Sequence, residues 1–179
     1  MTTTWASGKD GSHRATNVLS MIRLVVRPYE NPDAQRLVQA LYAEQLDTYG
    51  FADPPESEVA SDYVVPFGML LVAYTSAGKP VGCGGYRTYD AATQTAEIRK
   101  MYVDPSARGQ RLGYQILSKL EHEAAARGAT QMVLETGALN IAAIGLYTSS
   151  GYEAIPSYVE GRRETNRAFA KTLAADQGC

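Results

Sequence analysis

The chain has 179 residues, of which 45% are hydrophobic and 20% are charged, and its formal net charge at pH 7 is −2. This length and composition suit one globular domain with a sizeable core, and the balance of charge argues against nucleic-acid and anionic-membrane partners, whose binding proteins usually carry a basic excess. Cys83 and Cys179 make neither a disulfide framework nor a metal-ligand pattern, so the sequence predicts a cytoplasmic protein without a bound metal.

The N-terminal residues differ from the rest of the chain. Residues 1–20 (MTTTWASGKDGSHRATNVLS) lack the apolar core of a signal peptide and are predicted to form a disordered tail. Met21 directly precedes the first strand pattern, which raises the hypothesis that the natural chain starts there. The remainder, residues 21–175, is predicted to be a single domain, and no apolar window in it reaches membrane-spanning length.

The domain begins with a strand and a helix. Residues 22–29 (IRLVVRPY) are rich in β-branched side chains and predict a strand. Asn31 and Pro32 fit a helix start, and helical spacing of apolar residues continues to about Tyr49. After the break at residues 50–56, residues 57–65 predict a short helix or an irregular segment. The aromatic residues of this region either line a pocket or pack, and packing is favoured for each of them: Tyr42, Tyr49, Phe51 and Tyr63.

Three strand patterns follow, at residues 69–74, 79–87 and 95–103. The short turns between them predict an antiparallel meander. Gly82, Gly84 and Gly85 lie inside the middle strand, where glycine is unfavourable. We therefore expect a bulge there or the close approach of another backbone.

The second half changes to an alternation of helices and strands. Residues 112–127 predict an amphipathic helix, on which His122 falls away from the apolar stripe and is expected at the surface. Residues 131–136 predict a strand, which the β-α-β order places parallel to the strand ending at Val103. A second helix is expected at residues 140–150, and two last strands at residues 152–155 and 167–173.

The stretch from Val103 to Gly113 (VDPSARGQRLG) joins a strand to a helix. Asp104 and Pro105 stop the strand, and Gly109 and Gly113 leave backbone amides uncovered where the helix begins. A helix start carries unpaired N–H groups and a partial positive charge, which favour a phosphate or pyrophosphate. The same residues equally fit a plain turn, and the loop alone does not decide between the two.

Four segments in order resemble the GCN5-related N-acetyltransferases, which transfer acetyl from acetyl-coenzyme A to an amine. They are AEIRKMYVDPSARGQRLG, the amphipathic helix after it, the strand ending LETG, and NIAAIGLYTSSGY, and together they cover roughly residues 95–152. The resemblance implies an α/β (α+β) domain with one mixed sheet of about six to seven strands and helices on both faces. It also implies acetyl-coenzyme A (acetyl-CoA) as co-substrate and no metal.

The resemblance further implies where the coenzyme binds. The strand ending at Val103 and the parallel strand would splay apart around the pantetheine arm, and amides near Met101 and Val103 would bond to it, one of them as an oxyanion donor. The pyrophosphate would be held by the amides of the loop, which belong to Arg108, Gly109, Gln110, Arg111, Leu112 and Gly113.

One position departs from the family pattern Arg/Gln-x-x-Gly-x-Gly/Ala. Arg111 stands where the middle glycine is usual, so we expect ordinary helical dihedrals at this residue. Its side chain either crowds the diphosphate or reaches a phosphate directly.

Three side chains are candidates for the chemistry of transfer. Tyr147 lies where the family commonly has a tyrosine that protonates the departing thiolate, and it also fits the apolar side of its helix. Asn140 matches a position that often contacts the coenzyme arm, and it is a good helix N-cap as well. Glu97 is the first candidate for the base that deprotonates the amine, with Glu135 second. Each carboxylate is equally well explained as an exposed group paired with a basic neighbour.

The sequence therefore predicts an acetyl-CoA-dependent N-acetyltransferase that acts on a primary amine of a small molecule or a peptide. The alternative, favoured by Arg111, is a domain of the same fold that binds an acyl-CoA without turnover, as a sensor or a partner-binding module. A generic nucleotide-binding domain is a third option. Residues 42–66 and the chain after Gly151 are expected to shape the acceptor pocket, with Tyr86 and Tyr89 as candidate lining residues. A homodimer is left open.

Overall fold

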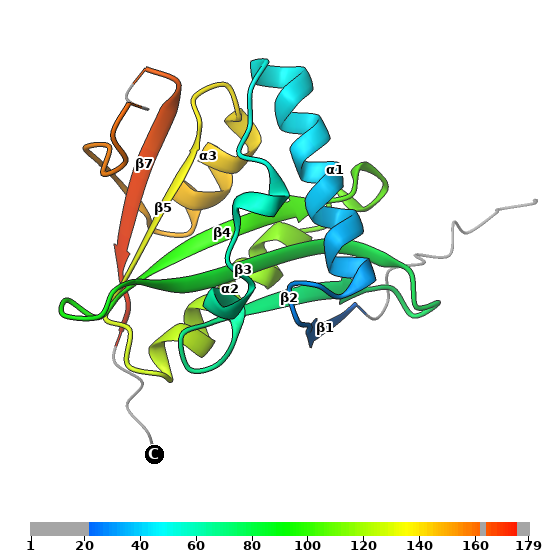
Figure 1. Ribbon diagram of the computed structural model, residues 1–179, viewed down its shortest axis with the longest axis horizontal. Helices are drawn as coiled ribbons and strands as arrows, with labels where there is room; N and C mark the ends of the chain where they lie inside the picture. The colour runs from blue at the N-terminus through cyan, green and yellow to red at the C-terminus, as the bar shows by residue number, and fades with distance from the viewer. Residues whose placement is uncertain (1–21, 162–163, 175–179) are drawn as a thin grey trace, which may run out of the picture.

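The computed structural model describes residues 22–161 and 164–174 (Figure 1). The predicted tail at residues 1–20, Met21 and Cys179 lie outside the described residues.

The described chain forms one mixed seven-stranded sheet with the strand order β1-β2-β3-β4-β5-β7-β6. All neighbouring strands are antiparallel except β4 and β5, which are parallel. The strands are β1 (Arg23–Val26), β2 (Gly68–Tyr74), β3 (Pro80–Asp90), β4 (Thr95–Val103), β5 (Gln131–Gly137), β6 (Glu153–Ile155) and β7 (Asn166–Thr172). The helices are α1 (Pro32–Tyr49), α2 (Leu112–Ala125) and α3 (Ile141–Ser149), with short 3-10 helices η1 (Pro55–Ser57), η2 (Ala60–Tyr63) and η3 (Pro105–Ala107).

Helices cover both faces of the sheet, as the sequence predicted (Figure 1). Side chains alternate across a strand, so Leu70 and Val72 of β2 pack with α1 on one face, whereas Met69 and Leu71 pack with α2 and α3 on the other. The apolar stripe of α2, including Ile116, is fully buried against this second face. The predicted antiparallel meander of β2, β3 and β4 is confirmed.

The ends of α1 follow the expected capping chemistry. The Asn31 side chain accepts hydrogen bonds from the backbone amides of Asp33 at 3.0 Å and Ala34 at 3.3 Å. Gly50 ends the helix in the left-handed conformation with φ of 74°.

Helix α2 ends at Ala125, slightly before the predicted residue 127, because the chain already turns into Gly128 with φ of 93°. His122 is exposed, as predicted.

The glycines of β3 mark a bulge, as predicted, and the close contacts at Gly84 come from side chains rather than from a backbone. The register between β3 and β4 shifts between Cys83 and Gly85. A Cβ built at Gly84 would lie 2.7 Å from Cγ2 of Ile116, and it would also meet the Met101 side chain. Glycine at this position therefore lets α2 pack directly on the sheet.

Candidate active site

A cavity of about 630 Å³, here named the cleft, opens where β4 and β5 diverge. The two strands pair only from Thr95–Glu97 to Gln131–Val133, near their beginnings. Beyond that point β4 runs toward α1 and β5 runs toward α3 (Figure 1). The cleft is lined by α1, β4, the loop before α2, the end of β5 and α3.

A backbone irregularity accompanies the divergence. Lys100 of β4 has φ of 54°, in the left-handed region that is uncommon for a residue with a side chain. This residue lies opposite the register shift in β3, as expected for a bulge that bends a strand. The bulge turns the Lys100 side chain toward the α1 side of the sheet, where its Nζ is 3.0 Å from Oε1 of Glu58.

The loop between β4 and α2 borders one side of the cleft. Asp104 caps η3 by accepting a hydrogen bond from the Ser106 amide at 2.9 Å, and Gly109 has φ of 75°. Arg111 is the N-cap of α2 and has φ of 60°, so the prediction of ordinary helical dihedrals at this residue is wrong. The sharp entry into α2 requires a left-handed residue there, which a glycine would supply without strain. The Arg111 guanidinium lies 5.1 Å from the ring centre of Tyr114.

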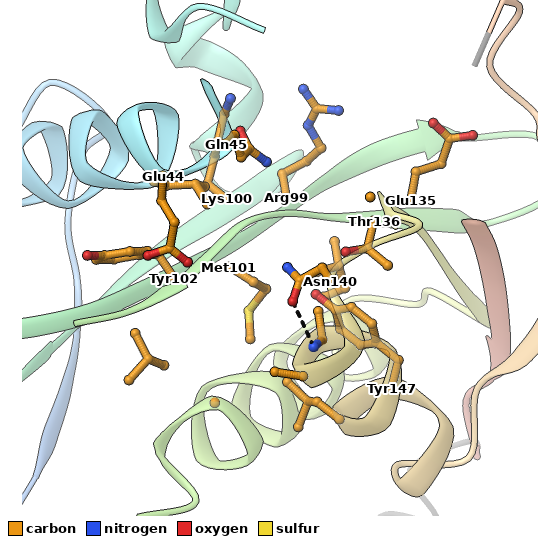
Figure 2. A pocket seen from close by; sticks show the side chains of 18 of the residues that line it. Glu44, Gln45, Arg99, Lys100, Met101, Tyr102, Glu135, Thr136, Asn140 and Tyr147 are labelled. Atoms are coloured by element: carbon orange, nitrogen blue, oxygen red, sulfur yellow. Dashed lines mark hydrogen bonds between the residues drawn. The ribbon is translucent and has the colours of Figure 1, made fainter. Parts of the chain in front are cut away.

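Helix α3 brings Asn140 and Tyr147 to the cleft (Figure 2). Asn140 caps the helix, because its Oδ1 accepts a hydrogen bond from the Ala143 amide at 3.1 Å. Tyr147 is 4% exposed, and its ring centre is 5.8 Å from that of Tyr152 and 6.5 Å from that of Phe169. Burial raises the pKa of the Tyr147 phenol above its usual value. Tyr147 therefore both packs in the core and faces the cleft.

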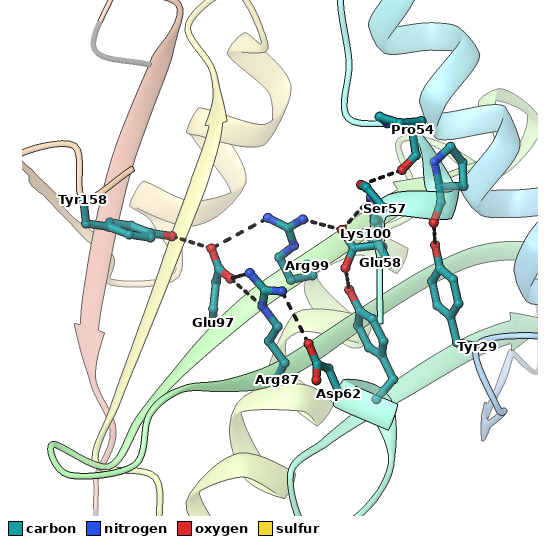
Figure 3. A network of polar contacts seen from close by, with 12 residues as sticks. Tyr29, Pro54, Ser57, Glu58, Asp62, Arg87, Glu97, Arg99, Lys100 and Tyr158 are labelled. Atoms are coloured by element: carbon teal, nitrogen blue, oxygen red, sulfur yellow. Dashed lines mark hydrogen bonds and ion pairs between the residues drawn. The ribbon is translucent and has the colours of Figure 1, made fainter. Parts of the chain in front are cut away.

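Glu97 lies on β4 with only 2% of its surface exposed, so of its two predicted alternatives the exposed carboxylate is wrong in its exposure. Arg87 of β3 donates from Nε to Oε2 at 2.9 Å, and the Tyr158 hydroxyl donates to Oε1 at 3.0 Å (Figure 3). Arg99 is more distant, with Nη1 at 3.8 Å from Oε1. These donors offset the cost of burying a carboxylate.

Glu58, which sequence reasoning missed, is a second buried carboxylate next to Glu97 (Figure 3). Its side chain is 2% exposed, contacts Arg99 and Lys100, and accepts a hydrogen bond from the Tyr63 hydroxyl. Burial alone would raise the pKa of Glu58, but Arg99, the Tyr63 hydrogen bond and Lys100 outweigh it and lower the pKa to about 2. Arg99 thus joins Glu58 and Glu97 in one network.

Comparison with known proteins agrees with this architecture. Residues 35–152 match the sequence profile of the Acetyltransferase (GNAT) family. The chain belongs to the GNAT family. It is 36% identical over 127 residues to the IAA acetyltransferase of Azospirillum brasilense, a match that covers 69% of this chain and 80% of the relative.

Two further relatives extend the comparison. The L-methionine sulfoximine/L-methionine sulfone acetyltransferase of Pseudomonas aeruginosa PAO1 is 36% identical over 87 residues, which are 47% of this chain and 50% of that protein. A crystal structure of a GNAT-family acetyltransferase from Staphylococcus aureus MU50 superposes with a TM-score of 0.70 at 18% identity, over 86% of this chain and 100% of that one. This structural similarity, at 18% identity, shows a shared fold.

Most residues that the sequence nominated for the GNAT site border the cleft. The lining includes Glu97, Met101, Val103, Arg108, Gly109, Arg111, Leu112, Gly113, Glu135, Asn140 and Tyr147, and also Tyr49 and Phe51. Gln110, Tyr42, Tyr63, Tyr86 and Tyr89 are not part of the lining. Tyr86 is 3% exposed and packs among the apolar side chains between the sheet and α2. Tyr89 packs edge-on against Tyr158 instead.

Several cleft residues were not named individually from the sequence. Helix α1 contributes Glu44 and Gln45, and β4 contributes Arg99, Lys100 and Tyr102 (Figure 2). Glu44 and Gln45 fall within residues 42–66, the segment that was expected to shape the acceptor pocket. The spacing of apolar residues in α1 did not indicate which polar side chains of that segment would reach the cleft.

Two kinds of feature are absent among the described residues. Among residues 22–161 and 164–174, three or more His, Cys, Asp or Glu side chains nowhere gather as a metal site would need. No helix within the same residues is long and apolar enough to cross a membrane.

Proposed function

We propose that this protein is an acetyl-CoA-dependent N-acetyltransferase whose acceptor is a primary amine of a small molecule or a peptide. The observation that carries the proposal is that one cleft brings together the diverging strand β4, the first amides of α2 and the Tyr147 hydroxyl. Membership of the GNAT family supports acetyl transfer, and the cleft supports where it takes place.

The cleft has the features that acetyl-CoA requires. The first amides of a helix lack intrahelical acceptors and carry the positive end of the helix dipole, which suits the pyrophosphate. A Cβ built at Gly113 would lie 3.3 Å from the Leu146 side chain, so a small residue keeps α2 and α3 close at this corner. Where β4 has left β5, the amides of Met101 and Val103 are expected to bond the pantetheine arm and to polarise the thioester carbonyl.

Acetyl-CoA supplies the activated acetyl group when bound, and the residues of this chain manage two protons. An alkylamine is protonated near pH 7 and must lose a proton before it can attack. Glu97 takes this proton through a water, because its carboxylate is buried behind Arg87 and Tyr158. A nitrogen–carbon bond forms as the carbon–sulfur bond breaks, and Tyr147 donates its hydroxyl proton to the departing thiolate. The nitrogen, which is positively charged after the attack, loses its second proton to solvent water and becomes a neutral amide. Solvent then returns a proton to Tyr147 and takes up the proton held by Glu97.

The names of two relatives favour a small acceptor. One is an IAA acetyltransferase and another an L-methionine sulfoximine/L-methionine sulfone acetyltransferase. Tyr49 and Phe51 add aromatic surface to a cleft that also holds carboxylates, which suits a compact molecule with an apolar part and an amine.

The test is a thiol-release assay with acetyl-CoA and a panel of amines that includes L-methionine sulfoximine, L-methionine sulfone, polyamines and peptide N-termini. We expect turnover with at least one small amine. Thermal unfolding with acetyl-CoA, ATP or NAD adds a binding measurement, since a ligand at about 100 times its dissociation constant stabilises by roughly 2.7 kcal/mol. Stabilisation by acetyl-CoA without turnover would support the non-catalytic alternative, and stabilisation by ATP or NAD alone would contradict both.

A further inference from the structure

Two neighbouring hydroxyl groups, from Ser157 and Tyr158, reach the two carboxylates that are candidates for the base. The Tyr158 hydroxyl donates to Oε1 of Glu97 at 3.0 Å, and the Ser157 hydroxyl donates to Oε1 of Glu135 at 2.9 Å. Glu97 is on β4 and Glu135 is on β5, the strands that diverge to form the cleft. The segment between β6 and β7 is thus tied to both sides of the divergence.

The contacts of Glu97 fix both of its oxygens from different elements. Oε2 is held by Arg87 of β3, whose Nε and Nη2 are each 2.9 Å away, and Oε1 is held by Tyr158 (Figure 3). The carboxylate is therefore held from two sides. Two arginines, Arg87 and Arg99, face the hydrogen-bonded pair of Glu97 and Tyr158. On their other sides, Arg87 contacts Asp62 and Arg99 contacts Glu58. The negative charge of Glu135 also acts on Tyr158.

Tyr158 is itself held in place as a hydrogen-bond donor. Its ring packs edge-on against Tyr89, with ring centres 5.1 Å apart and an interplanar angle of 69°. Burial, the charge of Glu97 and the hydrogen bond to Glu97 all raise the pKa of the Tyr158 phenol. The hydroxyl therefore keeps its proton over the working range of pH and continues to donate to Glu97.

Glu135 is bound differently. Its hydrogen bonds in the described residues come from neutral donors, Ser157 at 2.9 Å and Asn166 at 3.3 Å. Glu97 instead has the buried position and the charged partner that fix a carboxylate most firmly. A base that works through one water needs such a fixed position, because the water must be aligned with both the amine and the carboxylate.

We propose that Tyr158 is a positioning residue for proton removal from the amine, acting through Glu97, and that Ser157 and Glu135 do not have this role. This inference rests on the proposed N-acetyltransferase function. The Tyr158 hydroxyl holds Oε1 of Glu97 in one orientation, so loss of the hydroxyl must slow proton removal from the amine without weakening substrate binding.

The test compares kcat and KM for Tyr158→Phe, Ser157→Ala and Tyr89→Phe. Tyr158→Phe keeps the ring and removes the donor to Oε1 of Glu97, so kcat is expected to fall by about 10- to 100-fold while KM for the amine and for acetyl-CoA stays unchanged. A merely structural defect would raise KM and lower the free energy of unfolding as well. Ser157→Ala and the packing control Tyr89→Phe should leave kcat unchanged.

A second variant guards against misfolding of Tyr158→Phe. Site-specific 3-fluorotyrosine at position 158 keeps both the ring and the hydroxyl donor, so its kcat should stay close to that of the wild-type protein. An unchanged kcat in Tyr158→Phe would overturn the inference, as would an equal loss of kcat in Ser157→Ala or in the 3-fluorotyrosine variant. Absence of thiol release by the wild-type protein with every amine would instead reject the proposed function itself, so the two failures are distinct.

Discussion

Arg108 and Glu44 form an ion pair between the loop before α2 and helix α1, with Nη2 2.5 Å from Oε2. Arg108 also donates from Nε to the Val103 carbonyl at 2.9 Å, and its guanidinium lies 5.9 Å from the ring centre of Tyr102. Arg108 and Glu44 both line the cleft. The first residue of the predicted phosphate loop is therefore already paired with an anion, which a bound phosphate would have to replace.

Glu44→Gln should consequently tighten acetyl-CoA binding. An exposed ion pair of this kind is worth about 0.2–1 kcal/mol, so the dissociation constant should fall by up to about fivefold, as measured by isothermal titration calorimetry. Asp47→Asn removes the same charge from an exposed position of the same helix and serves as the control. An equal gain in both variants would point to general charge, and weaker binding of Glu44→Gln would contradict the prediction.

Tyr147→Phe should abolish most of the turnover while leaving acetyl-CoA binding intact. The ring continues to pack against Tyr152 and Phe169, and only the proton for the departing thiolate is lost. General acid catalysis is typically worth about 10²- to 10⁴-fold, so kcat should fall within that range.

Tyr152→Phe is the matched control for this variant. Its ring is equally buried, and its hydroxyl lies 3.8 Å from the sulfur of Met132, outside the cleft lining. This substitution should leave kcat unchanged. Equal turnover of Tyr147→Phe and wild type would remove Tyr147 from the mechanism.

Gly84→Ala should destabilise the protein because the new methyl group would meet Ile116 and Met101. Overpacking of a core costs roughly 1–3 kcal/mol, measurable as a lower free energy of unfolding in urea. Gly145→Ala in α3 is the control, since no atom lies within 4 Å of its built Cβ. That substitution should stabilise by up to about 1 kcal/mol through helix propensity. Equal stability of the two variants would argue against a tight α2–β3 contact.

The sequence was informative where a residue's environment is local. The bounds of β4 were predicted as residues 95–103, because a short turn precedes the strand and Pro105 stops it. Asn31 and Asn140 were identified as caps, since a cap bonds to amides two or three residues away.

Long-range polar contacts could not be predicted in the same way. Glu58 lies in a segment without periodicity, and its partner Arg99 is 41 residues away. The bond between Tyr158 and Glu97 spans 61 residues. The prediction of ordinary helical dihedrals at Arg111 was wrong for a different reason. The entry into α2 imposes a left-handed conformation on this residue, which a residue with a side chain does not favour.

Glu58 should make stability depend on pH in the acid range. Its pKa is lowered from 4.5 to about 2, so the folded state binds its proton more weakly than the unfolded state does. The resulting stabilisation is complete above pH 4.5 and is lost as the pH falls toward 2, with a total on the order of 3 kcal/mol. Urea unfolding at several pH values between 6 and 3 should show this loss.

Glu58→Gln provides the comparison. The variant should be less stable at pH 7, because Arg99 and Lys100 lose a buried countercharge. Its stability should also fall less steeply with acid than that of the wild-type protein. Parallel pH dependence in the two proteins would contradict the assignment.

Arg111 allows the backbone and the side chain to be tested separately. Arg111→Ala removes the guanidinium and keeps a side-chain residue at φ of 60°, whereas Arg111→Gly removes both the guanidinium and the strain. A left-handed residue with a side chain costs roughly 1–2 kcal/mol, so the glycine variant should unfold with a free energy about 1 kcal/mol above that of the alanine variant. Both variants lose the contact with Tyr114 equally.

The same two variants decide what the Arg111 side chain does for the coenzyme. Arg111 and Tyr114 both line the cleft beside the first amides of α2, so we expect the guanidinium to contact a phosphate. Both variants should then bind acetyl-CoA about tenfold more weakly at low ionic strength, with a smaller loss at high salt because screening weakens the charge contact. Tighter binding by Arg111→Gly than by the wild-type protein would show instead that the side chain crowds the diphosphate.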